Sequence, residues 1–290
     1  MKYAFINDNK NEFPILRMCL VLGVKKGSYY AWLRRPASNR SKKRKETLQQ
    51  ILEVYKESKS LYGSPKIYQA LKKKNITCSE NSIARIMHEN GIRAKICKKF
   101  RKTSKSVKPE HASPNLLNRC FEVLFPNMIW VTDITYILTR NGWMYLCVFI
   151  DLYSRKVVGW SMANHMRAEM VVAALEMACQ NRNPAKGLII HSDQGSQYGS
   201  ELFRSVLRTR GMIQSMSGRG ECWDNACAES FFHLLKTELI HFMNYLNLAE
   251  AKNSIFYYME VFYNRMRIHS TLGYMSPSDF ESKKSLSQCL

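Results

Sequence analysis

Three acidic residues in this 290-residue chain have the types and the spacing of a metal site: Asp133, Asp193 and Glu229. Asp133 lies inside the apolar, β-branched run 130–137, and Asp193 directly follows the apolar run 188–192. Thirty-five residues separate Asp193 from Glu229, which falls within a helical pattern. Carboxylates inside or at the ends of core strands are costly to bury unless a cation neutralises them.

The cation that suits clustered carboxylate oxygens is a hard divalent ion such as Mg²⁺. Two such ions about 3.5–4 Å apart form the usual clamp for cutting and joining phosphodiesters. A single aspartate at the end of a strand is usually a turn residue, but three at this spacing favour a metal site. The carboxylates therefore predict a metal-dependent enzyme that acts on nucleic acid.

The positive charge of the chain is concentrated ahead of the carboxylates. The formal net charge is +21, and residues 1–110 contain 27 Lys and Arg against 8 Asp and Glu. Residues 111–290 contain 17 against 15. This asymmetry predicts a front part that binds a polyanion, followed by an enzymatic domain of balanced charge. A basic face that only improves solubility is the weaker interpretation.

The cysteines and the apolar runs indicate the cellular compartment. Nine cysteines, an odd number without a C-x2-C pair, predict free thiols in a reducing compartment. Cys222 and Cys227 leave zinc as an alternative, but no second Cys or His pair lies nearby at a matching interval. No apolar run approaches the ~18 residues of a membrane span, and no signal peptide is evident. We therefore expect a cytoplasmic protein.

The front of the chain predicts two helix-turn-helix units. Residues 12–35 form two helical stretches around a Gly-containing break, and Pro36 ends the second. After a basic connector over 39–45, helical patterns resume, with the Ser64-Pro65 pair starting one helix and Gly91 ending the last. The second helix of such a unit can enter a major groove, although a plain helical hairpin stays open for the first unit.

Basic side chains of the second unit and the following linker are expected to contact DNA phosphates, with strong dependence on salt. They are Lys72, Lys73, Lys74, Arg85, Lys98, Lys99, Arg101 and Lys102.

From residue 127 the pattern changes to strands and then to alternating helices and strands. The Asn141-Gly142 pair predicts a tight hairpin between the first two strands. The pattern as a whole predicts an α/β fold in which a mixed five-stranded sheet is flanked by helices. The predicted strands span 128–138, 143–152, 156–163, 186–191 and 212–216, and the predicted helices span 168–180, 200–209, 226–240 and 247–265.

The helix that carries Glu229 has one polar face. Asn225, Glu229, His233 and Lys236 recur at intervals of four, four and three, and therefore share this face. We expect Lys236 to hold a DNA phosphate near the reacting bond, the alternative being an exposed lysine at a helix end. Asn225 and His191 are candidates for supporting the metal ligands, although a packed histidine is the commoner role for His191.

Three further residues have weaker claims on the site. Asp151 ends the second predicted strand and is expected behind the metal ligands, because the residues after it resemble a turn. Trp143 and Trp223 are expected in the core or in an interface rather than as surfaces on which bases stack.

Several segments resemble those of OrfB-type insertion-sequence transposases, bacterial members of the DDE transposase and retroviral integrase superfamily. The similar segments are 132–136 (TDITY), 191–198 (HSDQGSQY), 225–232 (NACAESFF) and a tail from Tyr263 to Pro277. The spacing of the second and third acids fits, as does a basic residue, Lys236, seven positions after the glutamate. The resemblance spans roughly residues 12–281 and is more specific than three acids alone.

The resemblance implies a ribonuclease-H-like integrase catalytic core. Asp133 would lie on its first strand, Asp193 at the end of the fourth, and Glu229 on the helix after the fifth. In such enzymes the first of these bridges two Mg²⁺ ions and the others hold one each, with Mn²⁺ as an alternative ion. The implied chemistry is strand cleavage at the ends of a mobile element, followed by transfer of the freed 3′-OH into target DNA.

The resemblance also implies partners and a domain layout. The partners are the terminal inverted repeats, target DNA, a second copy of the chain and an OrfA-type product of an upstream frame, joined by frameshift fusion or bound separately. The protein would be cytoplasmic in a bacterium and nucleoid-associated when bound to DNA. The expected domains are a helix-turn-helix segment (1–40), a second such module (41–93), a basic linker (94–120), the catalytic core (121–246) and a C-terminal helical extension (247–290).

The chain departs from its relatives in a few places. It lacks the zinc-binding His/Cys module that precedes retroviral cores, and Gln194 stands where an arginine is common. It also lacks the upstream helix-turn-helix and leucine zipper, so we expect it to be the catalytic part of a larger fusion. Two rival functions stay open: a DNA-binding regulator without catalysis, and a junction or RNA-hybrid nuclease that cuts without joining.

Overall fold

The computed structural model describes residues 1–36, 38–95, 113–118, 122–218 and 225–288. The chain divides into two compact units, Met1–Glu53 and Val54–Leu290. No helix in these described ranges is long and apolar enough to cross a membrane.

The first unit consists of short helices packed around a small core. Its helices are α1 (Lys2–Asp8), α2 (Ile15–Val21) and α3 (Lys26–Arg34), followed by the start of α4 (Asn39–Glu57). Ile6, Met18, Cys19 and Tyr29 form the buried core. The predicted helix pair is confirmed, and α1 is an additional helix that the sequence pattern did not reveal.

The predicted basic connector over residues 39–45 is wrong, because these residues form the first turns of α4. Ser38 precedes this helix, and its hydroxyl accepts a hydrogen bond from the backbone N–H of Ser41 at 3.2 Å. Such a cap favours a helix start. Lys and Arg are also good helix formers, so a run of basic residues is compatible with a helix.

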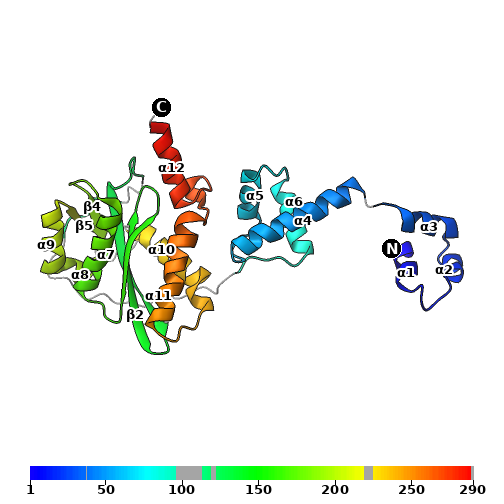
Figure 1. Ribbon diagram of the computed structural model, residues 1–290, viewed down its shortest axis with the longest axis horizontal. Helices are drawn as coiled ribbons and strands as arrows, with labels where there is room; N and C mark the ends of the chain where they lie inside the picture. Colours follow the sequence, from blue (N-terminus) through cyan, green and yellow to red (C-terminus); the bar gives the residue numbers. More distant parts are fainter. Residues whose placement is uncertain (37, 96–112, 119–121, 219–224, 289–290) are drawn as a thin grey trace. The chain divides into compact units, whose positions relative to one another are not determined.

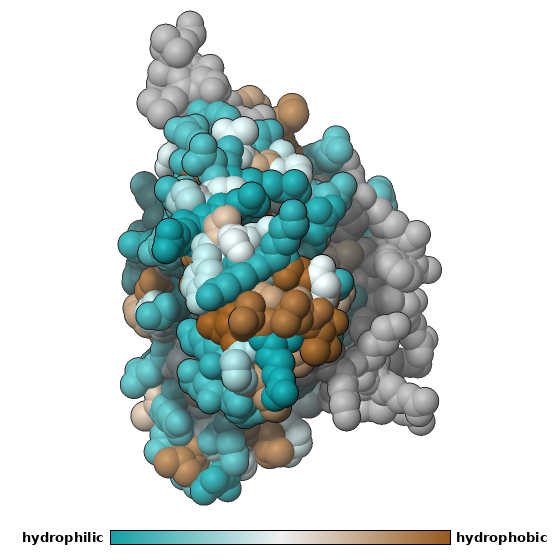
Figure 2. Space-filling view, turned by 90° about the vertical axis from the view of Figure 1, so that its right-hand side faces the viewer, coloured by the Kyte–Doolittle hydropathy of each residue, from teal (hydrophilic) through white to brown (hydrophobic). Residues whose placement is uncertain are grey.

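The helix α2 is apolar on its exposed side as well as on its buried side. Leu16, Leu20 and Val21 are exposed to 56%, 74% and 83%, respectively. Figure 2 shows apolar residues as a band across an otherwise largely hydrophilic surface.

The second unit opens with the helices α5 (Ser64–Lys73) and α6 (Glu80–Glu89). Pro65 lies in the first turn of α5, and the hydroxyl of Ser79 caps α6 by accepting from the N–H of Ser82 at 3.2 Å. Gly91 takes the left-handed conformation with φ +66° just after α6, as predicted. The buried faces of the two helices carry Ile67, Leu71, Ile83, Ile86 and Met87.

The predicted five-stranded mixed sheet is confirmed. Its strands are β1 (Ile129–Thr139), β2 (Gly142–Asp151), β3 (Val157–Ala163), β4 (Ile189–Ser192) and β5 (Ile213–Met216). They lie in the order β3-β2-β1-β4-β5. The first three are antiparallel neighbours, whereas β4 runs parallel to β1 and β5 runs parallel to β4.

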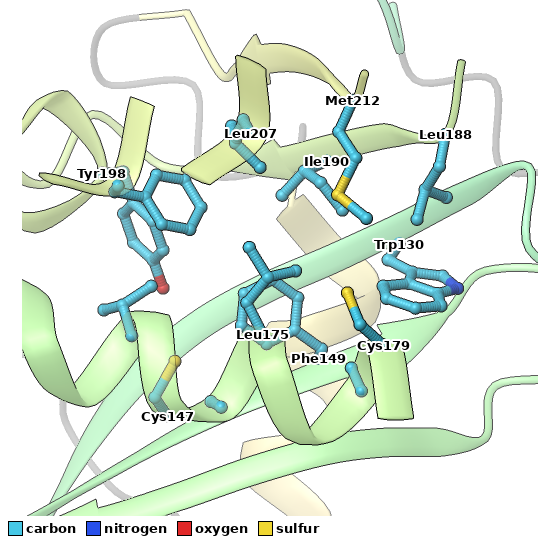
Figure 3. Close-up of a cluster of buried hydrophobic side chains, with 14 of the residues drawn as sticks. Trp130, Cys147, Phe149, Leu175, Cys179, Leu188, Ile190, Tyr198, Leu207 and Met212 are labelled. Atoms are coloured by element: carbon cyan, nitrogen blue, oxygen red, sulfur yellow. The ribbon is translucent and has the colours of Figure 1, made fainter. Parts of the chain in front are cut away.

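Helices cover both faces of this sheet, and the main core lies under α7. Figure 1 shows the sheet between a layer of α7 (Ala168–Arg182), α8 (Ser196–Gly199) and α9 (Glu201–Arg210) and a layer that contains α10 (Ala226–Glu238) and α11 (Leu248–Phe256). Trp130, Phe149, Leu175 and Tyr198 are among the buried side chains beneath the first layer (Figure 3).

Gly159 allows α7 to lie directly on β3. A Cβ atom at this position would lie 2.4 Å from the carbonyl oxygen of Ala174 and 2.5 Å from the backbone nitrogen of Ala178. Since no side chain fits this gap, the strand and the helix approach each other at backbone distance.

The C-terminal segment differs in detail from the single helix predicted over 247–265. The helix α11 continues as a π-helical stretch, η3 (Tyr257–Tyr263), which is followed by a 3₁₀ turn, η4 (Ser270–Leu272), and by α12 (Pro277–Gln288). Tyr258, Met259, Phe262 and Tyr263 are all buried in the π-helical stretch. The buried positions keep the spacing that the sequence pattern indicates, whereas the π-helical hydrogen bonding of this stretch is not revealed by that pattern.

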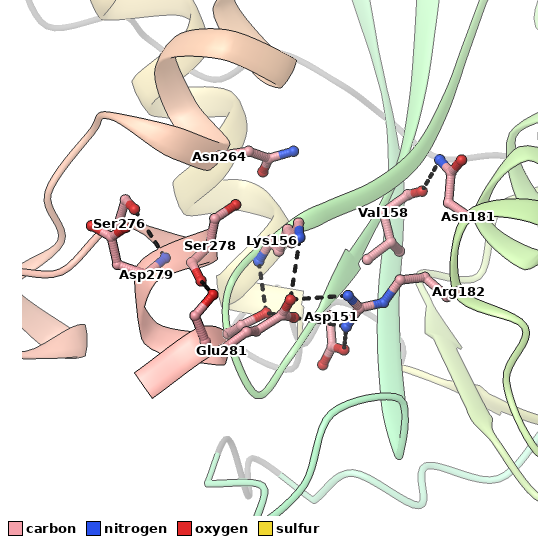
Figure 4. Close-up of polar contacts among 12 residues, drawn as sticks. Asp151, Lys156, Val158, Asn181, Arg182, Asn264, Ser276, Ser278, Asp279 and Glu281 are labelled. Carbon is pink, nitrogen blue, oxygen red and sulfur yellow. Dashed lines mark hydrogen bonds and ion pairs between the residues drawn. The ribbon is translucent and has the colours of Figure 1, made fainter. Parts of the chain in front are cut away.

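A buried network of charges holds α12 against the ends of the strands (Figure 4). The Arg182 guanidinium donates to Asp151 at 2.9 Å and to both carboxylate oxygens of Glu281 at 2.7 and 2.9 Å. Lys156 also pairs with Glu281 at 3.2 Å. Asp151 was expected behind the metal ligands. Its carboxylate instead binds Arg182 and accepts from the N–H groups of Asn127 and Tyr153. Along the sheet, Asp151 lies opposite Trp130 of β1.

A second buried ion pair fixes the far end of α10. The Arg267 guanidinium contacts Glu238 at 2.6–3.1 Å, and the two side chains are only 5% and 12% exposed. The hydroxyl of Tyr258 donates to Glu238 at 2.8 Å. Burial and then the charge of Arg267 lower the pKa of His269 to about 3, so this neighbouring imidazole is neutral near pH 7.

The chain around Arg267 is also bonded to the segment that precedes α5. The hydroxyl of Tyr62 accepts from the N–H of Ile268 at 2.9 Å and donates to the carbonyl of Met266 at 3.3 Å. The segment before α5 and the end of α10 thus meet at the same tripeptide, of which Arg267 and Ile268 are buried.

Replacing Arg267 with Met should leave the Glu238 carboxylate buried without its cation and lower the free energy of unfolding by about 3–5 kcal/mol. Urea unfolding followed by circular dichroism measures this loss. The double variant Arg267→Met/Glu238→Gln should recover part of it, because the unpaired charge is then gone. As a matched control, Lys74→Met breaks an exposed pair with Glu57 and should cost less than about 1 kcal/mol. Equal losses at the two positions would contradict the stabilising role of the buried pair.

Candidate active site

Asp133 lies near the middle of β1, five residues into the strand. Its side chain is half-buried, and its Oδ1 accepts a hydrogen bond from the N–H of Ile134 at 2.7 Å. Strand β4 pairs with β1 only as far as Val131, so the edge of β1 beside Asp133 is left to α10.

The electrostatic surroundings strongly disfavour the charged form of Asp133. Burial, together with the negative charge of Asp193, raises the pKa of Asp133 from 3.8 to about 8. The charge of Glu229 adds to this rise, whereas the N–H of Ile134 and the ammonium of Lys236 oppose it. The three predicted carboxylates therefore share one electrostatic environment, and the nearby cation does not neutralise it.

Asp193 directly follows β4, and its carboxylate lies at the carboxyl end of that strand. The residue is exposed, and its Oδ1 accepts a hydrogen bond from the N–H of Gly195 at 3.0 Å. The surrounding chain still removes enough water from the carboxylate to raise the pKa of Asp193, which the Gly195 N–H partly offsets. Because β4 is parallel to β1, its end brings this carboxylate towards Asp133.

His191 is held inside the sheet by two serine hydroxyls. Its imidazole is completely buried, with Nδ1 2.9 Å from the hydroxyl of Ser215 and Nε2 3.2 Å from that of Ser217. The histidine therefore links β4 to β5 and the segment after it, which is the packed role considered for it from the sequence.

Glu229 lies in the first turn of α10, and Asn225 ties the start of this helix to β1. The side-chain Nδ2 of Asn225 donates to the carbonyl of Thr132 at 3.1 Å, one residue before Asp133. The side-chain Oδ1 of Asn225 is buried and has no hydrogen-bond partner among the described residues. An orphaned acceptor at this place leaves room for a water molecule or another donor beside the carboxylates.

Lys236 extends from the same helix towards β1. Its ammonium lies 5.0 Å from the centroid of the Tyr136 ring. Burial lowers the pKa of Lys236, and the opposite charge of Asp133 counteracts this shift. A cation that is partly desolvated beside a carboxylate is well placed to bind a phosphate oxygen.

The chemistry of these donors fits a divalent cation, although the carboxylates are not gathered into a finished shell. No group of three or more His, Cys, Asp or Glu side chains in the described part of the chain is close enough to hold one ion. Mg²⁺ in enzymes that act on phosphates commonly uses only one or two carboxylates, together with water and the substrate. The raised pKa of Asp133 and the orphaned Oδ1 of Asn225 are both features that a bound cation and its water would relieve.

The predicted DNA-contacting side chains fall into different groups. Lys72 and Arg85 are exposed on α5 and α6, whereas Lys73 lies 4.0 Å from Asp279 and Lys74 lies 3.2 Å from Glu57. The four basic residues predicted over 98–102 lie outside the described residues, as do Cys222 and Trp223. Five cysteines in the described part of the chain form no disulfide: Cys19, Cys78, Cys147, Cys179 and Cys227.

Two features near the site were not predicted from the sequence. Trp143 was expected in the core or in an interface, but it is 51% exposed at the tip of the β1–β2 hairpin. Tyr136 and Leu138 alternate with buried residues along β1 and are both exposed. This alternation is the one sequence signal that indicates an exposed surface beside Trp143. The ion pair between Arg267 and Glu238 could not be recognised from the sequence, because the two residues are 29 positions apart.

Comparisons with known proteins agree with this architecture. Integrase core domain families match residues 125–222 and 229–285, and an HTH-like domain family matches residues 42–100. The transposase InsF for insertion sequence IS3A of Escherichia coli (strain K12) is 39% identical, covering 98% of this chain and 99% of that protein.

Two further proteins are similar. The insertion element IS600 uncharacterized 31 kDa protein of Shigella sonnei is 37% identical over 92% of this chain and 98% of that protein. The HTLV-2 integrase catalytic core domain in complex with magnesium (trimeric form) aligns with a TM-score of 0.44 at 18% identity, covering 55% of this chain and 98% of that one. With its near full-length identity to InsF, the chain belongs to the IS3 family of insertion-sequence transposases, polynucleotidyl transferases with an integrase core that act in DNA transposition.

Proposed function

We propose that this transposase cuts and joins DNA at a divalent-metal site formed by Asp133, Asp193 and Glu229. The observation that carries the proposal is the placement of three carboxylates on β1, directly after β4 and in the first turn of α10. Burial and then the charge of Asp193 raise the pKa of Asp133 to about 8, and the charge of Glu229 adds to the rise. Clustered acids of this kind are unfavourable in the folded chain unless a cation binds among them.

The roles that we propose for the residues are those that the resemblance to integrase cores implies. Asp133, in the middle of the sheet, would contribute to both ion positions, while Asp193 and Glu229 would each hold one side. When bound, two Mg²⁺ ions, or Mn²⁺ in their place, would activate the attacking water or 3′-OH and stabilise the leaving oxygen. Lys236 would hold a phosphate oxygen of the strand that reacts, and Asn225 would keep the start of α10 against β1.

The DNA would be bound mainly by the helical modules ahead of the core. Lys72 and Arg85 on α5 and α6 would contact phosphates of the terminal inverted repeats, with a contribution from the basic linker over residues 94–120. We propose further that two copies of the chain act together, because two element ends have to be joined, and that the product of an upstream frame participates by frameshift fusion or as a partner. The domain boundaries given above stay predictions of the same kind.

A strand-transfer assay tests this function. Labelled element ends are incubated with Mg²⁺ or with EDTA, using this chain alone and a version fused to the upstream frame. Joined products that require Mg²⁺ would support the proposal, and the version that forms them would identify the active species. Cutting without joining would favour a nuclease, and binding without any product from either version would favour a DNA-binding regulator.

Asp193→Asn should reduce strand cleavage and joining by at least about 100-fold, because one charged ligand of the cation is lost. DNA binding should be unchanged, since Asp193 lies in the core and not in the helical modules. The measurement compares product formation and gel-shift affinity with those of Asp279→Asn, a carboxylate that is 60% exposed on α12. Mg²⁺-dependent cleavage at the wild-type rate in the Asp193 variant would rule out the site assignment.

The stability of the metal-free protein should depend on pH through Asp133. Its carboxyl has a folded-state pKa of about 8 and an ordinary value of 3.8, so the folded chain binds the extra proton between these values. The contribution of Asp133 to the free energy of unfolding therefore falls as pH rises from about 4 to about 8. Melting temperatures in EDTA should show this fall in wild type relative to Asp133→Asn, and Mg²⁺ should reduce it. Identical pH profiles for the two proteins in EDTA would contradict the raised pKa.

A further inference from the structure

An exposed aromatic pair lies near the turn of the β1–β2 hairpin. Tyr136 is 39% exposed and Trp143 is 51% exposed. Their rings pack edge to face, with centroids 5.2 Å apart and an angle of 82° between the planes. The backbone beneath them is regular, because Tyr136 pairs with Tyr145 and Leu138 pairs with Trp143 in the antiparallel register.

The pair lies on the face of the sheet that packs against α7, in the part of this face near the hairpin turn that is left exposed. Cys147 and Phe149, further along β2, are completely buried in the core beneath α7. Towards the hairpin turn the same face carries Tyr136, Trp143 and Leu138, which is 61% exposed. Three neighbouring apolar side chains make a continuous exposed patch rather than isolated surface residues.

Lys236 links the patch to the candidate active site. Tyr136 and Asp133 are three residues apart on β1 and project from opposite faces of the strand, but the ammonium of Lys236 lies 5.0 Å from the centroid of the Tyr136 ring. The same ammonium lies close enough to Asp133 to influence its carboxyl electrostatically. One cation therefore stands between the aromatic pair and the carboxylates.

We propose that Tyr136 and Trp143 form an aromatic platform that stacks an unpaired base of the DNA end, while Lys236 holds the adjoining phosphate at the carboxylates. The assignment rests on the proposed function of that site. Bases inside an intact duplex do not expose their faces, so the occupant is a nucleobase released from pairing next to the reacting phosphate. An aromatic surface beside a cation suits such a nucleotide, because the base stacks on the ring and the phosphate pairs with the ammonium.

Trp143 is the ring that takes the base. It is the more exposed of the two rings, and the Lys236 ammonium already lies over the ring of Tyr136. Tyr136 fixes the indole by its edge-to-face contact and thus acts as a positioning residue.

The test measures DNA binding by the full chain in EDTA, so that no chemistry is needed. The probes are duplexes of the element's own end, either fully paired or with the terminal nucleotides unpaired, that carry the fluorescent base 2-aminopurine at one position at a time. Wild type should bind the unpaired end more tightly, and Trp143→Ala should lose roughly 10-fold in affinity for that end with little change for the paired duplex. The 2-aminopurine emission should rise in this variant at one or two adjacent positions only.

Two further variants separate stacking from other effects. Trp143→Phe keeps an aromatic face and should retain most of the preference for the unpaired end. Leu202→Ala removes a 45% exposed apolar side chain from α9, outside the patch, and should behave as wild type. Thermal melting of each variant shows whether the hairpin is still folded.

The outcomes distinguish this proposal from the one on which it rests. Equal preference for unpaired ends in wild type and Trp143→Ala would overturn the platform. A change in the oligomeric state of Trp143→Ala by light scattering, with affinity lost equally for both duplexes, would also overturn it and assign the patch to contact with a second copy. Trp143-dependent stacking without any Mg²⁺-dependent product would keep the platform and overturn the proposed catalysis.

Discussion

The structure of this transposase depends on the cost of placing a carboxylate in the middle of a packed sheet. Asp133 lies on β1 among apolar neighbours, and the negative charges of Asp193 and Glu229 make its own charge harder to sustain. The N–H of Ile134 and the ammonium of Lys236 oppose this effect without cancelling it. Negative charge is therefore concentrated around Asp133 without full compensation. The elements around this residue have to resist rearrangements that would move the carboxylates apart.

Resistance comes from fastening α10 at both ends. Asn225 bonds its start to the carbonyl of Thr132, and Arg267 holds its end through Glu238. Glu229 and Lys236 lie between these two attachments and are thereby kept beside β1. The bonds of Tyr62 to the tripeptide around Arg267 extend the arrangement to the segment before α5, so that α10 and the segment before α5 share one anchor.

Much of this could be predicted from the sequence, because strong local patterns determine it. The β-branched runs, the Asn141-Gly142 turn and the spacing of the acids were sufficient for the five strands and for the elements that carry Asp133, Asp193 and Glu229. The sequence could not reveal contacts between distant positions, such as Arg267 with Glu238, or the π-helical turns of η3. The exposure of Trp143 depends on where α7 stops covering the sheet, which is a tertiary property that the strand pattern does not contain.

The anchor at Arg267 also bears on how copies of such an element decay in a genome. A copy that loses its last few dozen codons keeps all three acidic residues of the proposed site, and a search for those acids alone would count it as intact. Its α10 would nevertheless end in an unpartnered glutamate and lose the buried aromatic support of η3. Inventories of mobile elements should therefore score the C-terminal arginine together with the three acids when they separate competent copies from relics.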